Sequence, residues 1–213
     1  MDLEKVVRDI VKATLKELEK EKVYFEVPVG VSGRHVHLSQ EDLEVLFGKG
    51  YSLTVFKNLK QPGQFAANEK VTLTGPLGAI SNVRILGPVR SKTQIEISLT
   101  DCFTLGLKAP LRDSGDLTNS GKIVIIGPKG EVIKKEGLII ARNHLHLSIE
   151  DGRRYGLKDK DRVNIYTSGE RQVAFFNVLV RCGNAHATEF HVDTDEANAA
   201  FLKTGDLVKV EKI

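Results

Sequence analysis

One stretch of this sequence occurs twice, and the two copies hold four of the six histidines in the chain. The first copy, RHVHLSQED, runs from Arg34 to Asp42, and the second, NHLHLSIED, runs from Asn143 to Asp151. Both contain His-x-His-Leu-Ser-x-Glu-Asp. A repeated motif of this length indicates a duplicated unit, so we expect two related halves that each place a histidine pair in the same way.

The spacing of the paired histidines suits a metal site. Side chains two residues apart in a β-strand point to the same face, so His35 and His37 would lie side by side, as would His144 and His146. Two neighbouring imidazoles favour a divalent metal that prefers nitrogen ligands, zinc above all, although cobalt, nickel and iron also accept such ligands. Each pair therefore predicts part of one metal site.

A third ligand for each site has to come from elsewhere in the chain. Gln94-Ile-Glu-Ile can be aligned with Glu189-Phe-His-Val, which places Glu96 opposite His191. Each of these two residues lies between apolar neighbours on a short alternating segment and would point to the other face. We expect Glu96 to complete the first set and His191 the second. His186 has no counterpart in the repeat, and we expect it to lie outside both sets.

Each histidine pair runs into a helix-capping sequence. Residues 39–42 and 148–151 both match the pattern Ser-x-x-acid, in which the serine side chain accepts a hydrogen bond from a backbone N–H in the first helical turn. We therefore expect a short helix directly after each histidine strand. A capped helix at that point would hold the strand end rigidly, as a metal site requires.

The rest of the pattern predicts a mainly β fold. Short alternating segments separated by Gly, Pro and Asn fill the chain after residue 22. We expect two tandem small β-barrel domains with short capping helices, residues 23–110 and 111–213, and the barrels could exchange strands. The expected strands are 24–31, 51–56, 70–74, 83–86, 94–99, 122–126, 131–140, 162–166, 175–181, 189–192 and 207–210.

Residues 1–22 form a separate segment. Apolar residues recur there every three or four positions, with charged residues between them, which predicts one amphipathic helix over residues 2–22. The charged face mixes both signs, which is not typical of a helix that lies on a membrane surface. Such a helix packs on the protein itself, packs on a second copy, or docks on another protein. The sequence leaves these alternatives open.

The composition disfavours several classes of protein. The 213 residues are 41% hydrophobic and 28% charged, as in ordinary globular proteins. No apolar run approaches the roughly 20 residues that span a bilayer, and the first residues lack a signal-peptide core. We therefore expect a cytoplasmic protein without a membrane partner. A dispersed net charge of +3 and few aromatic residues disfavour nucleic-acid binding. Cys102 and Cys182 lack C-x-x-C spacing, so reduced thiols are expected.

Arg90 is a candidate anion-binding residue. It lies in the turn Gly87-Pro-Val-Arg-Ser-Lys-Thr, just before the segment that carries Glu96. A guanidinium group offers paired donors that match the oxygens of phosphate. A zinc ion with three protein ligands keeps a position open, which is typical of catalytic sites. Two such ions in one cleft could orient an anion and an electrophile together.

Three segments of the chain resemble a known family. Residues 29–39 (VGVSGRHVHLS), 87–101 (GPVRSKTQIEISLTD) and 141–148 (ARNHLHLS) are similar to the PduL-type phosphotransacylases, also called phosphate propanoyltransferases. The similarity extends from about Pro28 to the C-terminus. It implies reversible conversion of a short acyl-CoA, propionyl-CoA or acetyl-CoA, and phosphate to an acyl-phosphate and free CoA. It also implies a homodimer with two zinc ions per chain, held by His35, His37 and Glu96 and by His144, His146 and His191.

The same resemblance implies roles for further residues. Arg90 would bind phosphate, and coenzyme A would contact Ser32, Lys57, Arg84, Leu86, Phe103, His191 and Asn198. Family members inside bacterial microcompartments often carry a short N-terminal amphipathic helix as an encapsulation signal, and residues 2–20 look like one. Its partners would be shell or core proteins of a microcompartment in the cytoplasm. The short joining segment leaves local packing of this helix open.

Two alternative functions remain open from the sequence. His35-x-His37-x-x-x-Glu41 and the matching stretch to Glu150 superficially resemble the first motif of two-domain cupin metal oxygenases, although the second cupin motif has no match. A non-catalytic, zinc-stabilised protein associated with a shell is the other alternative. Structural zinc is normally closed by four protein ligands, which disfavours it.

Overall fold

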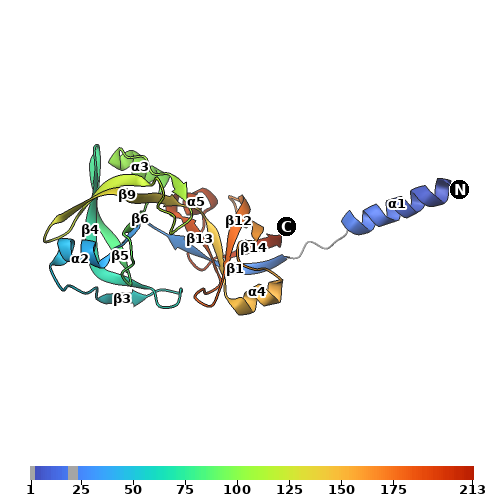
Figure 1. Ribbon diagram of the computed structural model, residues 1–213. Coiled ribbons are helices and arrows are strands. Elements are labelled where there is room, and N and C mark those ends of the chain that lie inside the picture. Colours follow the sequence, from blue (N-terminus) through green and yellow to red (C-terminus); the bar gives the residue numbers. More distant parts are fainter. Residues whose placement is uncertain (1–2, 19–23) are drawn as a thin grey trace.

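The computed structural model describes residues 3–18 and 24–213. Figure 1 shows two β-barrels side by side, with helix α1 (Leu3–Leu18) drawn apart from them. The predicted N-terminal helix is therefore confirmed over these 16 residues, while residues 2 and 19–22 of that prediction lie outside the described ranges. Within those ranges, no helix combines the length and the apolar character needed to cross a bilayer.

Six strands close the first barrel in the order β4-β5-β2-β6-β9-β8, because β8 pairs with both β9 and β4. The pairs β2–β5 and β6–β9 are parallel, and the others are antiparallel. Strands β3 and β7 extend this sheet by pairing with β4 and β9. The bounds are β2 (His35–His37), β3 (Val55–Asn58), β4 (Phe65–Gly75), β5 (Gly78–Gly87), β6 (Gln94–Glu96), β7 (Leu111–Arg112), β8 (Gly121–Ile126) and β9 (Glu131–Ala141).

Six strands also close the second barrel, in the order β1-β13-β10-β12-β11-β14. Its parallel pairs are β1–β13 and β10–β12. The two barrels thus have the same succession of parallel and antiparallel neighbours, strand for strand, which confirms the predicted mainly β fold of two small barrels. The bounds are β1 (Tyr24–Ser32), β10 (His144–Leu147), β11 (Arg162–Tyr166), β12 (Ala174–Cys182), β13 (Glu189–Asp193) and β14 (Leu207–Lys212).

The two halves of the chain exchange their first strands. Strand β1 directly precedes β2 in the chain but belongs to the second barrel, and β9 directly precedes β10 but belongs to the first. In Figure 1, the blue strand β1 accordingly lies among the orange and red strands of the second barrel. Strand pairing therefore crosses the expected boundary between residues 110 and 111. That residues 23–110 and 111–213 form two separate domains stays a prediction.

Alternating burial explains why these segments form barrel strands. In β14, Val208 and Val210 are buried, while Leu207 and Lys209, which precede them, are exposed. The inward residues of the two barrels form two separate apolar clusters, one in each barrel. Each barrel therefore has its own core.

Four short helices follow the four strands that carry candidate ligands. Helix α2 follows β2, α3 follows β6, α4 follows β10, and α5 follows β13. Their bounds are α2 (Gln40–Phe47), α3 (Leu99–Leu105), α4 (Ile149–Tyr155) and α5 (Thr194–Ala200). Each candidate ligand strand is thus short and ends at a helix cap.

The predicted caps of α2 and α4 are present, and each also includes a threonine. Ser39 accepts a hydrogen bond from the backbone N–H of Asp42, as predicted. The reciprocal link passes through Thr93, whose hydroxyl accepts from the N–H of Ser39 and donates to the Asp42 carboxylate. The second half repeats this arrangement with Ser148, Asp151 and Thr188. The repeat therefore includes a threonine that lies far from the motif in sequence.

Several expected strands have other limits, and those expected over 70–74 and 83–86 extend further, to Phe65–Gly75 and Gly78–Gly87. The strand expected over 94–99 ends at Glu96, because Ser98 and Asp101 form a complete capping box that begins α3. The strand expected over 51–56 runs instead over Val55–Asn58. The preceding residues turn toward β4, where Thr54 donates through its backbone N–H and its hydroxyl to the buried Glu69. Helices α3 and α5 were not predicted.

Candidate functional site

The first group of candidate ligands lies on two paired strands of the first barrel. The antiparallel register places His35 of β2 opposite Glu96 of β6. The ring of His37 lies 5.0 Å from that of His35, and the two ring planes are at 90°. Glu96 Oε2 lies 3.6 Å from His35 Nε2. One ligand atom from each residue lies within 4.8 Å of the others, so the three could hold one metal ion.

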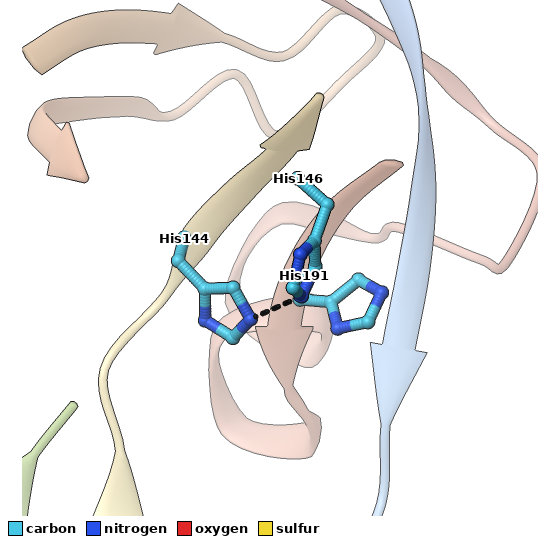
Figure 2. Close-up of side chains that lie close together, drawn as sticks. All are labelled: His144, His146 and His191. Atoms are coloured by element: carbon cyan, nitrogen blue, oxygen red, sulfur yellow. Dashed lines mark hydrogen bonds between the residues drawn. The ribbon is translucent and has the colours of Figure 1, made fainter. Parts of the chain in front are cut away.

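The second group repeats this arrangement with an imidazole in place of the carboxylate. His144 of β10 lies opposite His191 of β13 in the antiparallel register. Figure 2 shows the three side chains gathered together, with a dashed line between His144 and His146. The Nε2 atoms of these two rings are 3.0 Å apart. This group also places three ligand atoms within 4.8 Å of one another and could hold a second ion.

Backbone carbonyl groups orient one histidine in each group in the same way. Nδ1 of His35 lies 2.9 Å from the carbonyl oxygen of Gly33, and Nδ1 of His144 lies 2.9 Å from that of Arg142. In both copies the carbonyl belongs to the residue two positions earlier. A ring that donates through Nδ1 keeps a lone pair on Nε2, which is the usual arrangement of a metal-binding histidine.

The buried position of these rings sets their protonation. Burial lowers the pKa of His37 and of His144 to about 3, and it lowers the pKa of His146 further. For His35, burial acts to lower the pKa, but the charge of Glu96 and the hydrogen bonds with Glu96 and with the Gly33 carbonyl together raise it. Burial acts to raise the pKa of Glu96, and the charge and hydrogen bond of His35 reverse this and lower it.

These observations fit a pair of divalent metal sites. Neutral imidazole and ionised carboxylate are the forms that bind metal ions, so His35, whose pKa is raised, would release its proton when an ion binds beside Glu96. The Nε2 atoms of His144 and His146 face each other, so the pair needs either a proton or a metal ion between the two nitrogens. The structure thus brings together the two sets of three residues that the repeat indicated, one set in each barrel. Their role as metal ligands stays a prediction.

Two arginines lie beside these groups. Burial lowers the pKa of Arg90, the negative charge of Glu96 acts to raise it, and the positive charge of Arg181 adds to the lowering. Arg181 also acts on the pKa of His144 and His146 in the second group. Within residues 24–213, neither arginine forms an ion pair with a carboxylate. Two neighbouring cations without a carboxylate partner suit a phosphate-bearing ligand.

The residues expected to contact coenzyme A fall into three places. Lys57 lies on β3, and Arg84 and Leu86 lie on β5. These strands flank β4, since Lys57 and Leu86 both pair with Ala66. Arg84 lies opposite His35 in the parallel register, and Nδ1 of His37 lies 3.2 Å from the carbonyl oxygen of Leu86. Arg84 and Leu86 are thus neighbours of the first candidate metal group, whereas Lys57 lies on β3, which β4 and β5 separate from β2.

The other expected contacts belong to the second barrel or to α3. Ser32 ends β1, whose Gly30 lies opposite His191 in the parallel register. Asn198 is exposed on α5, and Phe103 is 74% exposed on α3. The exposed ring of Phe103 is free to contact a ligand. The contacts of all seven residues with coenzyme A stay predictions.

The glutamates of the cupin alternative lie away from the histidines. Glu41 and Glu150 are in the first turns of α2 and α4, and both side chains are exposed. Neither belongs to a candidate metal group among the described residues. His186 is also outside both groups, as expected, although its ring lies 4.3 Å from that of His146. The capping role of these helix starts accounts for the repeated acidic residues.

Three polar residues of the site were missed by sequence analysis. Gln94 donates to Glu96, Ser114 donates to the same carboxylate, and Arg181 lies near the second group. The alternation of β6 could have identified Gln94, which lies two residues before Glu96 on the same face. No local pattern marks Ser114 or Arg181, because both come from segments outside the repeated motif.

The fold and the site define a class of protein: a double β-barrel with one candidate metal group in each barrel and two arginines beside them. The profile of a family described as phosphate propanoyltransferase matches residues 28–203. A phosphate propanoyltransferase of Thermotoga maritima is 60% identical over 183 residues, which are 85% of this chain and 87% of the relative.

Two further relatives carry the same name. The phosphate propanoyltransferase of Rhodobacter capsulatus is 52% identical over 187 residues, covering 88% of this chain and 87% of the relative. That of Clostridioides difficile is 44% identical over 210 residues, covering 99% of each chain. The chain therefore belongs to the phosphate propanoyltransferase family, and it is an enzyme, a phosphotransacylase.

Proposed function

We propose that this enzyme interconverts a short acyl-CoA and phosphate with an acyl-phosphate and free CoA, and that propionyl-CoA or acetyl-CoA is its substrate. We further propose that two zinc ions assist, one held by His35, His37 and Glu96 and the other by His144, His146 and His191. The observation that carries the proposal is the pair of three-residue groups at equivalent positions of the two barrels.

The chain's own residues supply binding and orientation. In the proposed reaction Arg90 binds phosphate, with Arg181 as a second cation nearby. Holding phosphate against the thioester carbonyl removes much of the entropic barrier to a reaction between two molecules. One phosphate oxygen then forms a bond to the acyl carbon, the C–S bond breaks, and the thiolate leaves with its electron pair. A guanidinium group stabilises the negative charge that develops on the carbonyl oxygen.

The proposed zinc ions would add positive charge at an open coordination position, and thiolate is a ligand that zinc accepts well. A covalent acyl-enzyme is not needed. Burial raises the pKa of Cys102 and of Cys182, so both thiols stay protonated and are poor nucleophiles. Direct attack of phosphate on the thioester is therefore the simpler route.

The proposal includes partners and a location. We propose a homodimer in the cytoplasm, with the N-terminal segment directing it into a bacterial microcompartment. The side chains of Val6, Val7, Ile10 and Val11 are exposed on α1, between 37% and 59% of their surface. An exposed apolar stripe of this kind is what a shell or core protein could bind.

The function is tested by thiol release from propionyl-CoA, measured with and without phosphate. Wild type should release CoA only with phosphate and should carry two zinc ions per chain. Glu96→Ala and His144→Ala should each lower the rate by at least about 100-fold, because each removes a proposed metal ligand. The same variants should lose zinc in a metal count.

Glu41→Ala is the matched control. It removes an exposed glutamate near the same histidine pair that the proposed metal site does not use. We expect phosphate-dependent release near the wild-type rate, whereas a cupin-like site would lose its metal. Release that ignores phosphate would indicate a thioesterase. A zinc-loaded protein that acts on no short acyl-CoA would contradict the proposed reaction.

A further inference from the structure

The two oxygens of the Glu96 carboxylate have different surroundings. Oε2 faces His35 at 3.6 Å from Nε2. Oε1 accepts hydrogen bonds from Ser114 Oγ at 2.8 Å and from Gln94 Nε2 at 2.5 Å. Glu96 is 9% exposed, so these two donors are its main partners on that side. One oxygen is thus bound by donors, and the other is left to face the imidazoles.

Ser114 is itself held in place by a second contact with Gln94. The Gln94 amide donates to Ser114 Oγ at 2.9 Å, and the Gln94 carbonyl oxygen accepts from the backbone N–H of Gly115 at 2.8 Å. The NH₂ group and the carbonyl oxygen of the Gln94 side chain therefore both bind residues of the same segment, Ser114 and Gly115. This arrangement fixes the segment between β7 and β8 against the strand that carries Glu96.

The carbonyl group of Ser114 reaches toward the other candidate metal group. Its oxygen accepts a hydrogen bond from the guanidinium group of Arg181 at 3.2 Å. Arg181 lies on β12 of the second barrel, beside β10 with its two histidines. A single residue therefore contacts the carboxylate of one group through its hydroxyl and the arginine of the other group through its backbone.

We propose that Ser114 is a positioning residue for both groups. Its hydroxyl holds Glu96 Oε1 in a hydrogen bond, so that only Oε2 binds the metal ion. Its carbonyl oxygen keeps Arg181 directed at the space between the barrels. The inference rests on the proposed metal site and adds to it a residue from a segment outside the repeat. A carboxylate free to rotate offers either oxygen or both, whereas donors on one oxygen fix its orientation. Residues that orient metal ligands in this way affect metal affinity strongly.

The second half of the chain orients its third ligand differently. Glu189 takes the position of Gln94, and its Oε2 lies 2.7 Å from His191 Nε2. The partner of His191 is thus on the same strand, and no serine from a loop takes part in that hydrogen bond. Loss of the Ser114 hydroxyl should therefore weaken one of the two metal sites and leave the three-histidine site intact.

The test uses the zinc-loaded full chain and the release of zinc to a chromogenic chelator. Ser114→Ala should release one of two zinc ions at least about tenfold faster than wild type, and the second at the wild-type rate. Ser114→Thr, which retains a hydroxyl on a partly exposed residue, should restore slow release. Thr118→Ala is the matched control, since Thr118 is exposed on the same segment and should not alter release.

The outcomes separate this inference from the proposed function. Unchanged release of both ions from Ser114→Ala would overturn it, as would faster release of both ions to the same extent, which indicates a general loss of structure. A wild-type chain that binds no zinc would overturn it as well. If Ser114→Ala releases one ion faster but wild type transfers no acyl group, the positioning role stands and the proposed reaction fails. Metal-free Ser114→Ala should melt within a few degrees of metal-free wild type.

Discussion

At each candidate metal group, the residue two positions before the third ligand is chemically matched to that ligand. Gln94 donates through its amide to the carboxylate of Glu96, and Glu189 accepts from the imidazole of His191. Burial acts to raise the pKa of Glu189, but the hydrogen bond and charge of His191 lower it. The duplicated strands have therefore changed ligand and partner together, because a carboxylate needs a donor and an imidazole N–H needs an acceptor.

Gly30→Ala should disturb the three-histidine group without touching a histidine. A Cβ atom at Gly30 would lie 2.6 Å from Cδ and 2.8 Å from Oε2 of Glu189, which is too close for either to stay in place. The displaced carboxylate would no longer hold His191. We expect faster loss of one zinc ion in dialysis against a chelator, and a loss of about 1–3 kcal/mol in the free energy of unfolding.

Gly33→Ala provides the comparison for this variant. The nearest atom to a Cβ at Gly33 is Thr194 Oγ1 at 3.8 Å, an ordinary contact. It should retain both zinc ions as wild type does. Equal zinc retention by the two alanine variants would show that Glu189 does not orient His191.

Among the secondary-structure elements, helix caps decide where the strands of the site end. Ser98 and Asp193 begin α3 and α5 with complete capping boxes, immediately after the strands that hold Glu96 and His191. In each box, the side chain of the first residue and that of the acidic residue three positions later bind each other's backbone N–H groups. These caps stop the strands and turn the chain away from the ligands.

Ser98→Ala should therefore destabilise the chain without removing a ligand. Ser98 is 4% exposed, and its hydroxyl accepts from the backbone N–H of Asp101 at 3.2 Å. Loss of such a cap lowers the free energy of unfolding by about 1 kcal/mol. Urea unfolding would measure this loss. Thr104→Ala, at an exposed position later in α3, should change stability by less than about 0.5 kcal/mol. A larger effect at Thr104 than at Ser98 would contradict the capping argument.

At the scale of the whole molecule, the strand exchange couples the two barrels. Each barrel is closed by a strand that continues directly into the other barrel. Side chains add to the link: Gln61 forms two hydrogen bonds with the backbone of Ala187, at 3.0 and 3.1 Å, and Asp195 accepts from the backbone N–H of Thr100 at 2.8 Å. The candidate metal groups therefore belong to one assembly of two barrels.

Ile165→Ala should reveal this coupling. Ile165 is fully buried in the second barrel, and its truncation should lower the free energy of unfolding by about 2–5 kcal/mol. Because β1 and β9 cross between the barrels, we expect a single unfolding transition. Amide hydrogen exchange in β4 and β5 of the first barrel should become faster along with exchange in the second barrel.

The control for this experiment is Ile133→Ala. Ile133 is 69% exposed on β9, so its loss should change stability by less than about 0.5 kcal/mol. Faster exchange confined to the second barrel in Ile165→Ala would show that the barrels unfold separately and would contradict the coupling.

Much of the architecture was predictable because it depends on local patterns. Period-two alternation indicated most of the strands, and the helical period of the N-terminal segment indicated α1. The Ser-x-x-acid motif indicated the starts of α2 and α4, although the same kind of cap at Ser98 and Asp193 was not recognised. The expected strand through Leu99 was wrong for that reason, since a capping box outweighed the apolar residues that follow Glu96.

The sequence by itself determined that two histidine pairs share a face of a strand, and that Glu96 and His191 occupy matching positions. These positions can be predicted because the repeat and the period-two alternation are patterns of only a few residues. Only the tertiary structure decided which barrel each strand joins and which distant residues, such as Ser114, Thr93 and Arg181, meet the ligands. The physical reason is that strand pairing and side-chain hydrogen bonds join segments far apart in the chain, and no local periodicity records them.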